Sequence, residues 1–129
     1  DLARKTQYNG KAAVEDPLMR DRIMRQLIRE TALEENQRRT RVPELLEHPA
    51  RLQLQNKLLR SEIAQETSAL ALEVAGASAS LYLGDQNAPA AGQWPLAYMS
   101  TYGNTIAAGT SEVQRNILGE RVLSLAKSK

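Results

Sequence analysis

The sequence lacks cysteine and phenylalanine, and it has one histidine and one tryptophan in 129 residues. Without cysteine the chain can form neither a disulfide scaffold nor a thiolate metal site, and this composition fits a reducing compartment. The single imidazole, His48, has no second histidine or thiol to share a metal ion, so we interpret it as a surface residue and predict no metal site. From this composition we expect a cytoplasmic protein.

Long apolar runs and strong net charge are also missing. No apolar run approaches the roughly 18–20 residues of a membrane span, and no signal-peptide pattern opens the sequence. The formal net charge is only +2. Arginines recur from Arg20 to Arg41, but acidic residues interleave with them, which favours a solvated helix face over a phosphate track. We predict no nucleic-acid partner, and keep an independent helical interaction or DNA-binding module as the alternative.

The residues that are present predict helices. Apolar residues make up 42% of the sequence and aromatics only 4%, so the core must be aliphatic, and the length suits one domain. Asp16 and Pro17 suit a helix start, and apolar residues then recur at helical spacing. We predict the end of a helix over residues 1–8, broken at Asn9-Gly10, and further helices over about 17–41, 50–75, 95–102 and 111–125.

The predicted fold class is all-α, an up-and-down four-helix bundle formed by residues 1–129 as a single domain. Residues 43–49 and 83–93 are expected to be connections, and no segment predicts a strand. The apolar residues of the last helix, Val113, Ile117, Leu118, Val122 and Leu125, are expected to face inward.

Two features allow more than one interpretation. Trp94 precedes Pro95 and either anchors the long connection on the bundle or lines a ligand pocket or partner interface. Glu62 and Glu66 lie one helical turn apart, like a carboxylate metal pair. Because no Glu-x-x-His motif accompanies them, we favour a solvated pair.

The start of the last predicted helix, Gly109-Thr110-Ser111-Glu112, also has two interpretations. Thr110 can cap the helix, and the Glu112 carboxylate suits the positive end of the helix dipole. Alternatively, the hydroxyls and free amides bind a polar ligand at the helix N-terminus. The small residues before Thr110 would let such a ligand approach closely.

The stretch "TIAAGTSEVQRNILGERVLSLAK" resembles the C-terminal signature of the acyl-CoA dehydrogenase family, and "LARKTQYNGKAAVEDP" and "ALEVAGASAS" resemble two earlier elements more weakly. The resemblance implies the last of three domains, a four-helix bundle, with an N-terminal helical domain and a middle β-domain outside this chain. It also implies α,β-dehydrogenation of an acyl-CoA thioester: a carboxylate removes the α-proton, FAD takes the β-hydrogen as hydride, and an electron acceptor follows.

The resemblance also implies cofactor-binding residues. The threonine that contacts the nucleotide part of FAD falls on Thr110, with Ser111 and Glu112 in adjoining contact positions. The family's Gln-x-x-Gly-Gly element, which meets the FAD pyrophosphate of a neighbouring subunit, falls on residues 73–77. Gly76 is kept, whereas Glu73 departs from the pattern. The family's flavin-contacting arginine aligns near Gln7 and is absent there. We expect FAD in the complete protein but not on this chain alone.

The catalytic base is the largest departure. Many members have a glutamate immediately before the Gly-Thr step, where this chain has Ala108, and a methyl group cannot take a proton. Either the base lies on a helix preceding Asp1, or the chain belongs to a non-catalytic subunit of a heteromeric enzyme. The departures at the FAD site favour the second explanation or a divergent enzyme. The implied partners are a second copy or a homologous subunit.

Overall fold

The computed structural model describes residues 1–49 and 52–127, and these residues are mostly helical. The predicted all-α class is confirmed, with four helices of seven or more residues in the described part. With η marking short 3₁₀ helices, the order is α1 (Leu2–Lys5), β1 (Gln7–Tyr8), β2 (Lys11–Ala12), η1 (Ala13–Glu15), α2 (Pro17–Arg39), η2 (Pro43–Leu45), α3 (Leu52–Ala75), η3 (Gly76–Ser80), η4 (Pro89–Gly92), α4 (Gln93–Ile106) and α5 (Ser111–Arg121).

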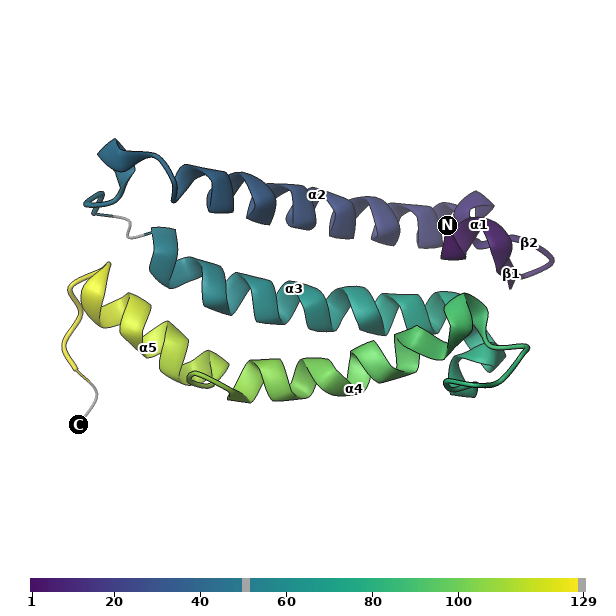
Figure 1. Ribbon diagram of the computed structural model, residues 1–129. Helices are drawn as coiled ribbons and strands as arrows, with labels where there is room; N and C mark the ends of the chain where they lie inside the picture. Colours follow the sequence, from purple (N-terminus) through teal and green to yellow (C-terminus); the bar gives the residue numbers. More distant parts are fainter. Residues whose placement is uncertain (50–51, 128–129) are drawn as a thin grey trace.

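The long helices are organised around α3. Figure 1 shows α2 running antiparallel along one side of α3, and α4 followed by α5 along the other side. The helix bundle is therefore formed as expected. One detail differs from a strict up-and-down order, because α4 and α5 run in the same direction and are separated by residues 107–110. That junction lies beside the first half of α3.

Local sequence signals account for the ends of α2 and α3. The Asp16 carboxylate accepts a hydrogen bond from the Met19 amide at 2.9 Å, and Pro17 occupies the first helical position. The α2 helix ends at Arg39, close to the prediction, and α3 ends at Ala75 as predicted. Gly76 then adopts a φ of +57°. The predicted start of α3 at residue 50 lies outside the described residues.

The predicted helix over residues 1–8 is wrong beyond Lys5. Residues Gln7–Tyr8 pair antiparallel with Lys11–Ala12 as a hairpin. Its turn is Asn9-Gly10, with φ values of +52° and +78°, as the Asn-Gly preference of two-residue hairpins requires. The break at Asn9-Gly10 was therefore identified from the sequence. The strands were missed because two residues are too few to produce an alternating pattern.

The last two helices differ from their predicted bounds. The α4 helix begins before Pro95, at Gln93, and extends to Ile106 instead of ending near residue 102. The α5 helix ends at Arg121, and the following chain folds back as the Leu125 amide donates to the Gly119 carbonyl at 3.0 Å. The prediction that Val113 and Leu125 face inward is wrong, since both are exposed. Ile117, Leu118 and Val122 are half-buried.

The core is thin. Ala13, Met19 and Val74 form a buried cluster where the chain segment before α2 meets the end of α3. Among the described residues no large side chain is fully buried. The α2 helix carries a second apolar surface that this chain leaves open, with Met24 at 47% and Ile28 at 64% exposure. None of the described helices combines the length and apolarity that crossing a membrane requires.

Candidate functional site

The turn between α4 and α5 has an unusual backbone. Ala107 ends α4 with its amide donating to the Gly103 carbonyl at 2.9 Å. Ala108 and Gly109 follow with φ values of +56° and +97°, both left-handed. Left-handed backbone costs about 1–2 kcal/mol for an L-residue with a Cβ. Ala108 therefore needs compensating contacts, which the neighbouring helices supply.

Two side chains hold the two carbonyls of this turn. Gln114, which is buried on α5, donates from Nε2 to the Ala108 carbonyl at 2.8 Å. Lys57 on α3 donates from Nζ to the Gly109 carbonyl at 2.5 Å. The neutral Gln114 donor contributes about 0.5–1.5 kcal/mol and the charged Lys57 donor about 1.5–3 kcal/mol, so the two together offset the strain at Ala108. No sequence pattern indicated Lys57, because it lies 52 residues from Gly109 and only the fold brings the two together.

Glycine is required at position 109 by space as well as by φ. A Cβ on Gly109 would lie 2.9 Å from Gln114 Nε2 and 3.3 Å from Val113 Cγ1. A larger residue would therefore displace the amide that holds the Ala108 carbonyl. The Gly-Thr step and Gln114 thus form one packed unit.

Thr110 caps α5 as predicted. The Val113 amide donates to Thr110 Oγ1 at 3.3 Å, and the Gln114 amide donates to the Thr110 carbonyl at 2.9 Å. The pKa of Glu112 is lowered, first by a hydrogen bond from its own backbone amide and then by one from the Thr110 hydroxyl. The Glu112 side chain is exposed, and Ser111 is half-buried beside it. The Thr110 hydroxyl and the Glu112 amide therefore already donate to a carboxylate at this position.

Replacing Thr110 by alanine should lower the free energy of unfolding by about 0.5–2 kcal/mol, because the Val113 amide loses its acceptor. Thr110→Ser should be nearly neutral, since serine presents the same oxygen. Chemical denaturation of the intact protein measures both. Equal losses for the two variants would show that the lost methyl group, and not the cap, is responsible.

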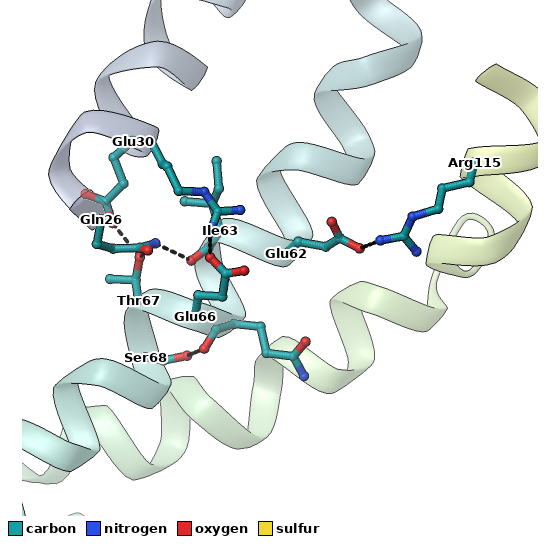
Figure 2. A network of polar contacts seen from close by, with 10 residues as sticks. Gln26, Glu30, Glu62, Ile63, Glu66, Thr67, Ser68 and Arg115 are labelled. Carbon is teal, nitrogen blue, oxygen red and sulfur yellow. Dashed lines mark hydrogen bonds and ion pairs between the residues drawn. The ribbon is translucent and has the colours of Figure 1, made fainter. Parts of the chain in front are cut away.

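The start of α5 is also tied to α3 by an ion pair. Arg115 Nη2 lies 2.5 Å from Glu62 Oε1, and Figure 2 shows Glu62 reaching across to α5. Glu66, one turn further along α3, pairs instead with Arg29 of α2. The two carboxylates therefore serve opposite neighbours and do not form a metal pair. No cluster of three potential metal ligands occurs in the described part of the chain.

The other predicted cofactor-binding residues, Glu73 and Gly76, lie at the opposite end of α3 from Lys57. Both terminal guanidinium nitrogens of Arg22, Nη1 and Nη2, donate to the Glu73 carboxylate, with Nη2 at 2.8 Å from Oε1. This hydrogen bonding lowers the pKa of Glu73. Both side chains are about half exposed, so solvent screening limits the contribution of the pair to about 0–1 kcal/mol. The Glu73 charge is nevertheless matched by a cation, which reduces its repulsion of a nearby anion.

Gly76 borders a cavity of about 530 Å³ between the N-terminal segment and η3. Lys5, Thr6, Gln7 and Ser78 line it together with Gly76. A Cβ on Gly76 would meet no atom within 4 Å, so a ligand can approach the backbone there. The structure thus brings Gln7 and Gly76 together. Lys5 and Thr6, which no sequence pattern indicated, supply a cation and a hydroxyl at the same place.

The predicted cofactor-binding residues at the start of α5 lie far from those around Glu73 and Gly76. Lys57, beside Gly109, and Glu73 are separated by 16 residues of α3, which corresponds to about 24 Å of helix. One small ligand group cannot contact both. The hydroxyl and amide donors at the start of α5 suit the polar groups of a dinucleotide such as FAD. Lys5 and Thr6, near Gly76, suit its phosphates. The residues present therefore fit FAD, with its contacts divided between two places.

The arginine run is largely matched by carboxylates. Arg25 pairs with Asp21 at 2.8 Å and Arg38 with Glu35 at 2.6 Å. Gln26 bridges from α2 to the Ile63 carbonyl and Thr67, whose hydroxyl donates to Glu30 (Figure 2). These contacts hold α2 in register with α3. They favour the solvated-face interpretation over a nucleic-acid surface.

Trp94 lies half-buried in the first turn of α4 and lines an apolar cavity of about 210 Å³ between α2 and α3. Ile23, Leu70 and Val74 form much of its wall. The tryptophan therefore anchors the connection on the bundle and lines a pocket at the same time.

Comparison with known proteins identifies the family of this chain. Residues 1–123 match the family model described as "Acyl-CoA dehydrogenase, C-terminal domain". The chain belongs to the acyl-CoA dehydrogenase family. Acyl-CoA dehydrogenase IpdE1 of Mycobacterium tuberculosis is 32% identical over 127 residues, covering 98% of this chain and 30% of that protein. IpdE1 of Mycolicibacterium smegmatis is 30% identical over 128 residues, covering 98% and 29%. The chain thus spans about three tenths of the length of these acyl-CoA dehydrogenases.

Two solved structures share the fold. The ChsE4-ChsE5 complex from Mycobacterium tuberculosis aligns with a TM-score of 0.83 at 23% identity, covering 98% of this chain and 33% of that chain. The Tcur3481-Tcur3483 steroid ACAD aligns with a TM-score of 0.78 at 19% identity, covering 89% and 30%. At these identities the likeness supports the helical architecture alone.

Proposed function

We propose that the chain is the C-terminal domain of an FAD-dependent acyl-CoA dehydrogenase, to which it contributes oligomer contacts and part of the FAD site. The observation that carries this proposal is the N-terminus of α5. Glu112 is exposed and Thr110 half-buried directly after a turn whose two carbonyls are fixed by Gln114 and Lys57. Because the acyl-CoA dehydrogenase family generally uses FAD, we infer that FAD is the ligand of this arrangement.

The proposed roles follow from donor chemistry. The hydroxyls of Thr110 and Ser111 and the first amides of α5 would hold polar groups of the FAD nucleotide. Gly76, with Lys5 and Thr6, would meet the phosphates of an FAD bound to a neighbouring subunit. Bound FAD would supply the acceptor for the β-hydrogen of the acyl-CoA, which leaves as hydride. Ala108 cannot remove the α-proton, so the base must come from another part of the assembly.

A second candidate is a non-catalytic subunit of a heteromeric acyl-CoA dehydrogenase. Ala108 at the usual base position and the open apolar surface of α2 favour it. The ChsE4-ChsE5 structure is, by its title, a complex, and one of its chains shares this fold. In this case a homologous subunit would supply the base, and the acyl-CoA substrate would bind in the assembled enzyme.

The chain on its own should be colourless and inactive, because it contains only part of the proposed FAD site and Ala108 cannot act as a base. The complete protein, co-expressed with a homologous subunit where its genome encodes one, should be yellow and should reduce a dye when acyl-CoA is added. The measurements are flavin absorbance per protein and dye reduction. Stoichiometric FAD or acyl-CoA oxidation by the chain alone would contradict the proposal.

Thr110→Ala in the complete protein should weaken FAD retention roughly tenfold, because one neutral hydrogen bond contributes about 0.5–1.5 kcal/mol. Thr110→Ser is the matched control and should retain FAD. If Thr110→Ala retains FAD as well as the unchanged protein, Thr110 serves only as a helix cap. The main support for a flavin site at this position would then be lost.

A further inference from the structure

We propose that Lys57 is a positioning residue of the flavin site, which sets the orientation of the Gly109–Thr110 peptide and hence of the Thr110 hydroxyl. The inference rests on the proposed function, because it takes Thr110 as an FAD contact. Lys57 contacts the Gly109 carbonyl, and this role does not require it to touch the cofactor.

The contact acts directly on the peptide that carries Thr110. Lys57 Nζ donates to the Gly109 carbonyl, and the same planar peptide unit includes the Thr110 amide. Fixing the carbonyl direction therefore fixes where Thr110 enters the helix. Gln114 holds only the preceding peptide, through the Ala108 carbonyl. The two donors come from different helices and leave both peptides of the turn fixed in space.

Gly109 makes this contact necessary. Glycine has more backbone freedom than any other residue, and its φ of +97° lies in the left-handed region. Because Gly109 has no side chain with which to anchor itself, an external donor must select one orientation of the step. Lys57 is half-buried and borders a cavity of about 600 Å³ with Arg60 and Asn104, so its remaining N–H groups can be hydrated.

Lys57 is not needed simply to attach α5 to α3, because the Arg115–Glu62 ion pair joins the same two helices. Glu62 follows Lys57 by more than one turn of α3, and Figure 2 shows its side chain pointing to Arg115 of α5, which lies beyond the Gly109–Thr110 step. Removing it should loosen α5 without releasing the Gly109 carbonyl. Glu62→Gln is therefore a matched control for any effect of Lys57 on helix packing.

The experiment compares Lys57→Met, Lys57→Arg and Glu62→Gln in the complete protein with its partner subunit. FAD dissociation is followed by flavin absorbance and fluorescence on dilution, and unfolding is followed alongside. Lys57→Met should weaken FAD binding roughly tenfold and alter the visible circular dichroism of the bound flavin. Lys57→Arg should restore most of the affinity, because a cationic donor is retained. Glu62→Gln should leave both flavin signals unchanged.

Several outcomes overturn the inference. It fails if Lys57→Met binds FAD as tightly as Glu62→Gln, or if Lys57→Arg is as weak as Lys57→Met. If Thr110→Ala weakens FAD binding while Lys57→Met does not, only the role of Lys57 is wrong. If neither variant changes FAD binding, the proposed flavin site is wrong as well. Should Lys57→Met not fold, Lys57→Gln and Lys57→Arg provide the same comparison of an uncharged and a charged donor.

Discussion

Replacing Gly92 by alanine should lower the free energy of unfolding by about 2–5 kcal/mol. Gly92 is buried at the start of α4 with a φ of +73°, and an added Cβ would lie 2.5 Å from the Leu83 nitrogen and 2.6 Å from the Tyr82 oxygen. Both are backbone atoms and cannot rotate away. The loss would therefore combine left-handed strain with a clash that only movement of the connection relieves. Urea denaturation of the intact protein measures it.

Gly84→Ala separates these two causes. Gly84 has a φ of +91°, but a Cβ there would meet nothing within 4 Å. Its cost should be limited to the strain of about 1–2 kcal/mol. Equal losses at positions 84 and 92 would mean that the packing of residues 82 and 83 against Gly92 is not as the structure has it.

Met19→Ala should cost about 2–5 kcal/mol, the usual range for truncating a large buried side chain. Met19 is 3% exposed and packs with Ala13 and Val74 in the buried cluster. The cavity left behind would lie where α2 meets the end of α3. The measurement is again the free energy of unfolding, from the denaturation midpoint and slope.

Met24 offers the matched control on the same helix. It is 47% exposed, so Met24→Ala should cost less than about 0.5 kcal/mol. A cost for Met24→Ala close to that for Met19→Ala would contradict the exposure of Met24. In that case a partner covers this side of α2 in the protein that is measured.

The sequence predicted the parts of the fold that are governed by neighbouring residues. Asp16 with Pro17 started α2, Thr110 capped α5, and Asn9-Gly10 broke the N-terminal segment, each through contacts within five residues. The family resemblance added which of these positions would meet FAD. That part is a prediction still, because the structure places the residues without testing their ligand.

The parts that could not be predicted depend on contacts between distant segments. Helical periodicity showed that α2 has apolar positions but did not distinguish the side with Met19, which meets α3, from the side with Met24, which does not. The Lys57–Gly109 and Arg22–Glu73 contacts join residues 52 and 51 positions apart. A lysine or arginine in a charged helix has no local feature that reveals such a partner.

The scarcity of fully buried large side chains has a consequence for what a measured stability would mean. In the described part of the chain no large side chain is below 2% exposure, so much of the apolar surface is still available for burial. A partner that binds only the folded form stabilises it by RT ln(1 + [L]/Kd), about 2.7 kcal/mol at one hundred times Kd. The melting temperature should then rise with protein concentration. Dilution would release the bound partner by mass action and so lower the free energy of unfolding, without any change of solvent.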